Sequence, residues 1–218
     1  MQFNTVIFDM DGLLINSEPL WDEAATEVFQ QYNFQLTKAQ YATTTGMRTK
    51  EFVERWFSHY NIDSRHNAVA ETAILKSVVD KVAAKGKAMS GVAHIFNFFI
   101  ERNFKIGLAT SSGKLLIDVV VDKLGIRNYL QSIESAAELP YGKPHPQVYL
   151  NCAEALKSHP TECICFEDSF NGLIAAKAAR MKCVVVPAAH DSKNEKFNAA
   201  DLKISSLMNF NSLLMQTL

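Results

Sequence analysis

Four short apolar runs, rich in β-branched residues, constrain the fold of this sequence more than any other feature. They span residues 5–8, 105–109, 163–166 and 183–186. Apolar residues at helical spacing fill the intervals between the last three runs, and Gly125 marks the expected end of the first of these helices. Strands that alternate with helices indicate parallel strands joined by right-handed crossovers. The sequence therefore predicts an α/β fold, a doubly wound parallel sheet with helices on both faces.

The interval between the first two runs is predicted to be helical throughout. Ser17 and Pro19 mark the start of one helix, and two further amphipathic stripes follow at residues 52–60 and 74–82. We expect residues 16–87 to form a small helical cap and residues 1–15 and 88–218 to form the core domain. The two connections are expected near residues 14–18 and 84–90. Such an insertion lies at the carboxyl edge of the sheet, where open α/β sheets bind ligands, so it is a candidate lid.

Composition narrows the class of protein further. The 218 residues are 48% apolar and carry a formal net charge of −1, which suits one core plus a smaller lobe and leaves no electrostatic footprint for nucleic acid or an anionic membrane. No apolar run reaches the roughly 18 residues of a membrane span, and no secretory signal pattern is visible. The four cysteines are expected to be small core residues. We expect a cytoplasmic monomer that acts on a small molecule.

Polar groups follow the predicted strands, whose carboxyl ends share one edge in a parallel sheet. These residues, with one loop lysine, are Asp9, Asp11, Thr110, Ser111, Lys143, Glu167 and Asp168. Residues two apart in an extended chain point the same way, so Asp9 and Asp11 converge. Because unit charges 4 Å apart interact by about 4 kcal/mol near a protein surface, some of the carboxylates at this edge should protonate or spread apart unless a cation is bound. Mg²⁺, which prefers carboxylate and phosphate oxygens, resolves the conflict.

This arrangement of groups suits phosphoryl transfer. A carboxylate can attack phosphorus and form an aspartyl-phosphate, which divides one difficult transfer into two easier steps. Asp9 is the candidate nucleophile, and Asp11 is the candidate acid and base that protonates the leaving alcohol and later activates water. Lys143 and Mg²⁺ would offset charge, while Thr110 and Ser111, at the start of a helix, would hold the phosphoryl oxygens.

With these residues in register, the chain resembles the haloacid dehalogenase superfamily of phosphohydrolases over essentially its whole length. The motifs that carry the resemblance are DMDGLL, the hydroxyl of Thr110, GKP with Lys143, and FEDS with Glu167 and Asp168. The resemblance implies a Rossmann-like core, Asp9 as nucleophile and Asp11 as acid and base. It also implies Mg²⁺ held by Asp9, the Asp11 carbonyl and Asp168, with Glu167 in or beside the first shell.

The helical insert resembles the small cap of the β-phosphoglucomutase-like branch. The stretches INSEPLW, GMR and LPYGKPHPQVYL are more similar to the sugar and hexitol phosphatases of that branch. Asn16 departs from the aspartate common there, which leaves its local contacts open. Leu20 stands where the mutases carry a cap histidine, which argues against mutase activity.

Three functions are compatible with these motifs. The first is a Mg²⁺-dependent phosphatase of small sugar or polyol phosphates, and the second is a β-phosphoglucomutase. The third is a non-enzymatic, phospho-accepting signalling domain, since receiver domains also combine an acceptor aspartate, a hydroxyl and a lysine. Asp11 and the inserted lid speak against the third, so we favour the phosphatase.

Discrimination among phosphomonoesters requires groups that reach the leaving alcohol, and the cap is best placed to supply them. Glu18 and Arg48 are expected to hydrogen-bond the hydroxyls of a hexose or hexitol phosphate. A surface ion pair is the alternative role for these two residues. Trp21, Trp56 and Phe57 are expected to pack in the core of the cap.

Overall fold

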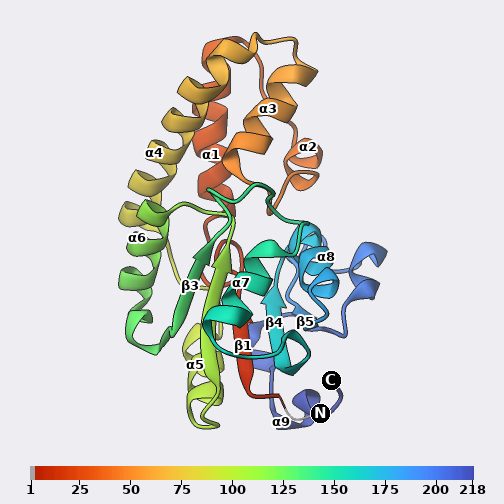
Figure 1. The fold of residues 1–218 in the computed structure, drawn as a ribbon. Coiled ribbons are helices and arrows are strands. Elements are labelled where there is room, and N and C mark those ends of the chain that lie inside the picture. The colour runs from red at the N-terminus through yellow and green to blue at the C-terminus, as the bar shows by residue number, and fades with distance from the viewer. Residues whose placement is uncertain (1–2) are drawn as a thin grey trace.

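A six-stranded sheet forms the centre of the computed structural model, which describes residues 3–218 (Figure 1). Its strands are β1 (Thr5–Phe8), β2 (Lys105–Thr110), β3 (Ser132–Ser135), β4 (Cys163–Glu167), β5 (Lys182–Val185) and β6 (Leu202–Lys203). All neighbouring strands are parallel, in the order β3-β2-β1-β4-β5-β6. The predicted parallel sheet is confirmed. The sequence analysis missed β3 and β6, which are the two edge strands.

Helices cover both faces of the sheet, and a second group lies beyond its carboxyl edge (Figure 1). The helices of the core are α5 (Val92–Ile100), α6 (Lys114–Leu124), α7 (Gln147–Ala155), α8 (Phe170–Ala178) and α9 (Ser212–Met215). The second group, here called the cap, comprises α1 (Glu18–Phe29), α2 (Lys38–Ala42), α3 (Thr49–His59) and α4 (Asn67–Lys85). The two amphipathic stripes predicted at residues 52–60 and 74–82 lie in α3 and α4.

Side chains alternate between the two faces along each strand, and this divides the core into two buried clusters. Phe8 and Leu108 pack with α5 and α6 on one face, whereas Ile7 and Cys165 pack with α7 and α8 on the other. The doubly wound arrangement is therefore confirmed. All four cysteines are buried and free, as expected for small core residues.

Two antiparallel backbone segments connect the cap to the core. The amide of Asn16 donates to the carbonyl of Lys87 at 2.8 Å, and the amide of Met89 donates to the carbonyl of Leu14 at 2.9 Å. The boundaries between cap and core, set from the sequence at residues 15–16 and 87–88, fall within this paired stretch and stay a prediction. The chain enters α1 directly after it, with Pro19 in the first turn, where a missing amide hydrogen costs nothing.

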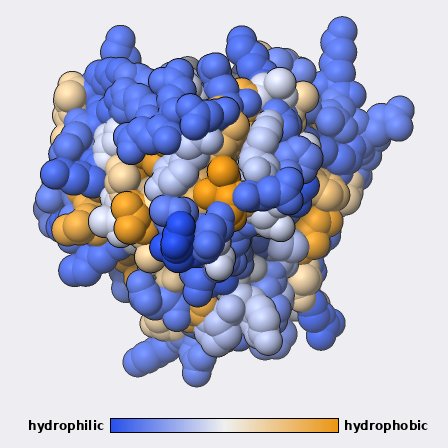
Figure 2. Space-filling model, turned by 90° about the horizontal axis from the view of Figure 1, so that it is seen from above, coloured by the Kyte–Doolittle hydropathy of each residue, from blue (hydrophilic) through white to orange (hydrophobic). Residues whose placement is uncertain are grey.

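The outer face of the cap is mostly hydrophilic. Seen from above, it shows small, separate hydrophobic patches among polar side chains (Figure 2). Trp56 and Phe57 are buried in the cap as predicted. Within residues 3–218, no helix combines the length and the apolar character that crossing a membrane requires.

Candidate active site

Asp9 follows the central strand β1, and the sheet holds its backbone in place. Its amide donates to the carbonyl of Phe166 at 3.0 Å, so the pairing of β1 with β4 continues one residue past the strand. The side chain is 9% exposed, and its Oδ1 accepts a hydrogen bond from Lys143 Nζ at 2.5 Å. A nucleophile placed here has a fixed backbone and one restrained carboxylate oxygen, which favours in-line attack on a bound group.

Lys143 lies beneath this edge of the sheet, buried in the loop that precedes α7. Its Nζ donates to Asp9, to Glu167 Oε1 at 2.7 Å and to the Ala109 carbonyl at 3.0 Å. These three bonds use every hydrogen of the ammonium group. Burial alone would lower the pKa of Lys143, but the Asp9 and Glu167 carboxylates outweigh it and raise that pKa. The lysine is therefore a permanent positive charge behind the nucleophile.

Glu167 ends β4 with no exposed surface, and its carboxylate is held from several sides. It accepts hydrogen bonds from the Tyr149 hydroxyl and from the amides of Asp168 at 3.1 Å and Ser169 at 3.2 Å. A Cβ at Gly172 would lie 1.7 Å from Glu167 Oε1, so only glycine fits in this turn of α8. The close approach places the carboxylate at the amino-terminal end of α8, which stabilises negative charge.

Asp9, Glu167 and Asp168 form the group of carboxylates that could hold a metal ion. One oxygen from each lies within 4.8 Å of the others. Burial, and then the Asp9 and Glu167 charges, raise the pKa of Asp168 well above its usual range. Gly12 permits the approach of Asp168, because a Cβ there would lie 2.0 Å from Asp168 Oδ2 and the residue has a φ of +76°. Three carboxylates this close together fit a hard divalent cation such as Mg²⁺.

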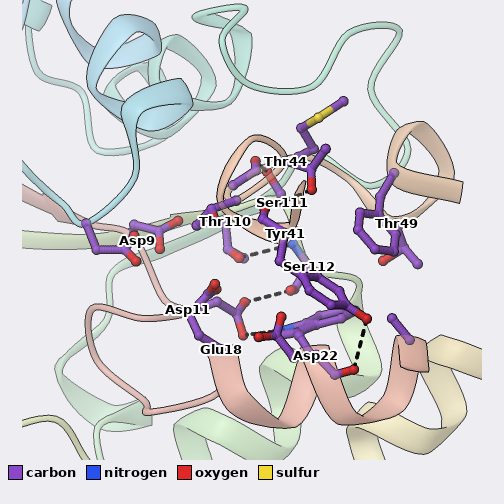
Figure 3. A pocket seen from close by; sticks show the side chains of 17 residues that line it. Asp9, Asp11, Glu18, Asp22, Tyr41, Thr44, Thr49, Thr110, Ser111 and Ser112 are labelled. Atoms are coloured by element: carbon purple, nitrogen blue, oxygen red, sulfur yellow. Dashed lines mark hydrogen bonds between the residues drawn. The ribbon is translucent and has the colours of Figure 1, made fainter. Parts of the chain in front are cut away.

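Asp11 is anchored by hydrogen bonds from both the core and the cap (Figure 3). Its Oδ1 accepts hydrogen bonds from Ser17 Oγ at 2.7 Å and Trp21 Nε1 at 3.0 Å, and its Oδ2 accepts one from Ser112 Oγ at 2.7 Å. The expectation that Trp21 packs in the cap core holds only in part: the residue is partly buried against the apolar core, and its side chain also lines the cavity above Asp11. Leu20 is the neighbour that is buried in the cap. One signal for Trp21 was available: it lies three residues after Glu18, on the same helix face.

A cavity of about 90 Å³ lies between cap and core and reaches Asp9, Asp11 and Asp168. Thr110 and Ser111 line it from the core, and Glu18 and Asp22 project toward it from α1 (Figure 3). Burial, followed by the nearby charges of Asp11 and Asp22, raises the pKa of Glu18 to about 8. The cavity therefore places hydroxyl and carboxyl groups around the space next to Asp9.

Comparison with known proteins agrees with this geometry. A family model described as haloacid dehalogenase-like hydrolase matches residues 6–186. The chain belongs to the haloacid dehalogenase-like hydrolase family. It is 37% identical over 209 residues to hexitol phosphatase B of Escherichia coli K12, which covers 94% of this chain and 93% of that protein. It is 28% identical to the fructose-1-phosphate phosphatase of the same organism, over 83% of this chain and 95% of that protein. The prediction of a phosphatase of this family is confirmed.

Solved structures show the same fold. A β-phosphoglucomutase from Clostridium difficile superposes with a TM-score of 0.87 at 22% identity, covering 99% of this chain and 96% of that one. The protein CbbY from Rhodobacter sphaeroides, in complex with xylulose-1,5-bisphosphate, gives a TM-score of 0.85 at 23% identity, covering 95% and 96%. These matches confirm the Rossmann-like core with a helical cap.

Arg48 of this phosphatase joins the cap to the core and does not line the cavity. Its guanidinium donates to the Leu139 carbonyl, to the Ala136 carbonyl at 3.3 Å and to Glu51 at 2.5 Å. Two further cap carbonyls accept hydrogen bonds from core side chains, Gly46 from Ser111 Oγ at 2.8 Å and Thr45 from Asn171 Nδ2 at 2.9 Å. The loop before α3 therefore rests on the core. The expected contact of Arg48 with substrate is replaced here by contacts with backbone carbonyls.

Proposed function

We propose that this phosphatase hydrolyses hexose or hexitol phosphates with Mg²⁺, through an aspartyl-phosphate on Asp9. One observation carries the proposal: the Asp9 carboxylate opens into the cavity while Lys143 and the sheet hold it, and the anchored Asp11 lies beside it. Attack by Asp9 on phosphorus releases the sugar alcohol, and water then splits the acyl phosphate. The hydroxyl-rich lining of the cavity and the printed names of the two phosphatase relatives support a polyol or sugar leaving group.

The metal site in this proposal consists of Asp9, Asp168 and the main-chain carbonyl of Asp11, with Glu167 in or beside the first shell. When bound, Mg²⁺ offsets the negative charge that the nucleophile and the phosphoryl group bring together. Lys143 contributes a second positive charge from below. Its three bonds to protein acceptors keep it in place throughout the reaction.

Thr110 is the best placed hydroxyl for holding the phosphoryl group. Its Oγ1 accepts a hydrogen bond from the amide of Ser112 at 3.1 Å, which leaves its own hydrogen free to donate into the cavity. Ser111 instead donates its hydroxyl hydrogen to the cap carbonyl of Gly46. We therefore assign phosphoryl binding to Thr110 first, and a role shared between phosphate and cap to Ser111.

Asp11 acts as the acid and base in this proposal. Its carboxyl protonates the departing alkoxide, and the resulting carboxylate takes a proton from the water that attacks phosphorus. The hydrogen bonds from Ser17, Trp21 and Ser112 set the direction in which it points. Because Trp21 lies on the cap helix α1, the position of the cap affects the position of the Asp11 carboxyl.

In this proposal Glu18 of the cap recognises the substrate, and Arg48 holds the cap against the core. Glu18 lines the cavity, and no protein group within residues 3–218 hydrogen-bonds its carboxyl in this structure, so both of its oxygens can pair with substrate hydroxyls. Arg48 holds the loop before α3 on the core through the carbonyls of residues 136 and 139. We keep Glu18 as the substrate contact and assign Arg48 to cap docking.

The experiment that tests the proposed function is a screen of phosphorylated metabolites scored by kcat/KM with Mg²⁺ present. We expect hexitol and hexose monophosphates to rank above nucleotides, phosphoamino acids and phosphorylated acids. A best substrate that is a nucleotide or a phosphoprotein would contradict the assignment of substrate class.

Metal removal should abolish activity, because the clustered carboxylates of Asp9, Glu167 and Asp168 repel an incoming phosphate when no cation is bound. We expect chelated enzyme to recover with Mg²⁺ and to be inhibited by Ca²⁺, whose looser coordination misplaces Asp9. Asp168→Ala should raise the Mg²⁺ concentration needed for half-maximal activity by about tenfold or more. Full turnover by thoroughly metal-stripped enzyme would refute this part of the proposal.

Trp21→Phe should weaken acid catalysis while it keeps an aromatic ring in the cavity. Losing a hydrogen bond to a charged group costs about 1.5–3 kcal/mol, so we expect roughly tenfold or more slower phosphoenzyme formation from a hexitol phosphate. The same step with p-nitrophenyl phosphate should change little, because p-nitrophenolate leaves without a proton. Rapid-quench measurement of phosphoenzyme separates these cases. An equal loss with both substrates would show that Trp21 acts by packing alone.

A further inference from the structure

The part of the cavity that receives the leaving group contains no basic side chain. Within residues 3–218, none of the residues that line the cavity is Lys, Arg or His. The lining residues are instead hydroxyl-bearing, apolar and acidic residues. The acidic residues that the cap contributes are Glu18 and Asp22. A second anionic group on a substrate would therefore meet no cation in this space.

Two basic residues of the site region, Lys143 and Arg48, are held by protein acceptors. Lys143 is buried beneath Asp9, with all three of its ammonium hydrogens bonded to protein acceptors. Arg48 lies between two cavity-lining residues in sequence, Met47 and Thr49, yet its guanidinium is directed to the carbonyls of residues 136 and 139 and to Glu51. Neither can move toward a bound leaving group without breaking several hydrogen bonds.

Glu18 and Asp22 face the cavity from one side of α1 (Figure 3). They are four positions apart, so their side chains lie one turn apart on the same helix face. Neither carboxyl takes part in an ion pair within residues 3–218. Burial raises the pKa of both groups. For Glu18 the charges of Asp11 and Asp22 add to this effect, whereas for Asp22 the Lys38 ammonium partly offsets it. Within residues 3–218, this wall of the cavity therefore offers carboxyl groups, and no lining cation, to a bound leaving group.

We infer that this cavity selects its substrates by the charge of the leaving group. It accepts monophosphates of neutral or cationic sugars and polyols, and it rejects substrates that carry a second phosphate or a carboxylate on the leaving group. The inference rests on the proposed function and narrows its substrate class. The fold alone does not impose this rule, since the CbbY structure of the same fold is a complex with a sugar bisphosphate. The rule comes from the side chains Glu18 and Asp22 and from the engagement of Arg48.

The same rule argues against a phosphosugar mutase. A mutase that passes through a bisphosphate must hold the non-transferring phosphate while the other one reacts, and that phosphate needs a cationic or strongly hydrogen-bonding partner. The cavity places Glu18 and Asp22 in that space. Retention of a bisphosphate intermediate is therefore unfavourable, and release of a neutral alcohol is the expected outcome.

Matched substrate pairs test the inference directly. Sorbitol 6-phosphate and 6-phosphogluconate differ at C1, where a hydroxymethyl group replaces a carboxylate, and glucose 6-phosphate pairs with glucose 1,6-bisphosphate. At a pH above the raised pKa of Glu18, where both carboxyls are ionised, we expect kcat/KM for the neutral member of each pair to exceed that of the anionic member by about 100-fold, the effect of a like charge in such a site. The variant E18Q/D22N should reduce this ratio by about tenfold. Glu54→Gln, at an exposed carboxylate of α3 outside the cavity, should leave the ratio unchanged.

Equal kcat/KM values within both pairs would overturn the inference, as would an unchanged ratio in folded E18Q/D22N. The single variants Glu18→Gln and Asp22→Asn serve the same purpose if the double variant does not fold. Phenyl phosphate and 4-carboxyphenyl phosphate separate this inference from the proposed function. Selective loss of the carboxylated aryl ester, in an enzyme that hydrolyses no sugar phosphate, would support charge selection and refute the sugar assignment.

Discussion

Asp9→Asn is expected to reduce kcat by about 10⁵-fold or more while the protein remains folded, because an amide has the shape of the carboxylate but is not a nucleophile toward phosphorus. The backbone of Asp9 is held by the bond from its amide to the Phe166 carbonyl, which the substitution leaves intact. Steady-state assays with a hexitol phosphate and with p-nitrophenyl phosphate should both show the loss. It should not depend on the leaving group, since no bond to phosphorus forms.

Asp11→Asn is the matched comparison for the nucleophile. It also replaces a carboxylate at this edge by an amide, but it leaves Asp9 able to attack. Phosphoenzyme should therefore accumulate in Asp11→Asn with p-nitrophenyl phosphate and be absent in Asp9→Asn. Acid-quenched protein analysed by mass spectrometry would report the added phosphoryl group and its position. Near-wild-type turnover in purified Asp9→Asn would rule out the covalent mechanism.

Lys143→Met should cause the second large effect, on both stability and activity. Lys143 is the cation that contacts the buried carboxylates of Asp9 and Glu167, at 2.5 Å and 2.7 Å. Removing one partner of a buried ion pair leaves an uncompensated charge and costs about 3–5 kcal/mol of folding free energy. Loss of positive charge behind the phosphoryl group should also lower kcat by about 10²–10³-fold. Denaturant unfolding and steady-state kinetics measure the two effects separately.

The double variant K143M/E167Q separates charge from packing. Glu167→Gln removes the carboxylate that Lys143→Met leaves without its cation, so much of the lost folding free energy should return, whereas activity should not. Lys114→Met provides the surface control. Its side chain is 88% exposed, and we expect its unfolding free energy to stay within about 0.5 kcal/mol of the parent value. If Lys143→Met unfolds at the same denaturant concentration as the parent, the ion pairs do not contribute as described.

The central strands and their polar ends could be predicted because their signals are local. β1, β2, β4 and β5 are nearly continuous apolar runs, as expected of strands covered on both faces. β3, with the sequence SIES, and the two-residue β6 are edge strands that are partly exposed, so their residues carry no such apolar signal. The conformation of these segments follows from pairing with a neighbour that is distant in sequence.

The candidate site divides in the same way. The spacing of the acidic motifs, read together with the family resemblance, was enough to place Asp9, Asp11, Lys143, Glu167 and Asp168 at one edge of a parallel sheet. The contacts of the cap residues Trp21 and Arg48 could not be predicted in this way. Helical periodicity tells which face of α1 bears Trp21, but whether that face meets the cap core or the cavity depends on how the cap docks on the core.

The sequence by itself therefore determined the order of the elements, the chemistry of the sheet edge and the class of reaction, because these depend on residue type and on spacing along the chain. The tertiary structure alone decided that Trp21 donates a hydrogen bond to Asp11, that Arg48 turns to the carbonyls of residues 136 and 139, and that Glu18 and Asp22 line the cavity. Each of these contacts joins segments whose closeness arises from the docking of cap on core. Periodicity gives the direction of a side chain on its own helix, and only packing supplies the partner that it meets.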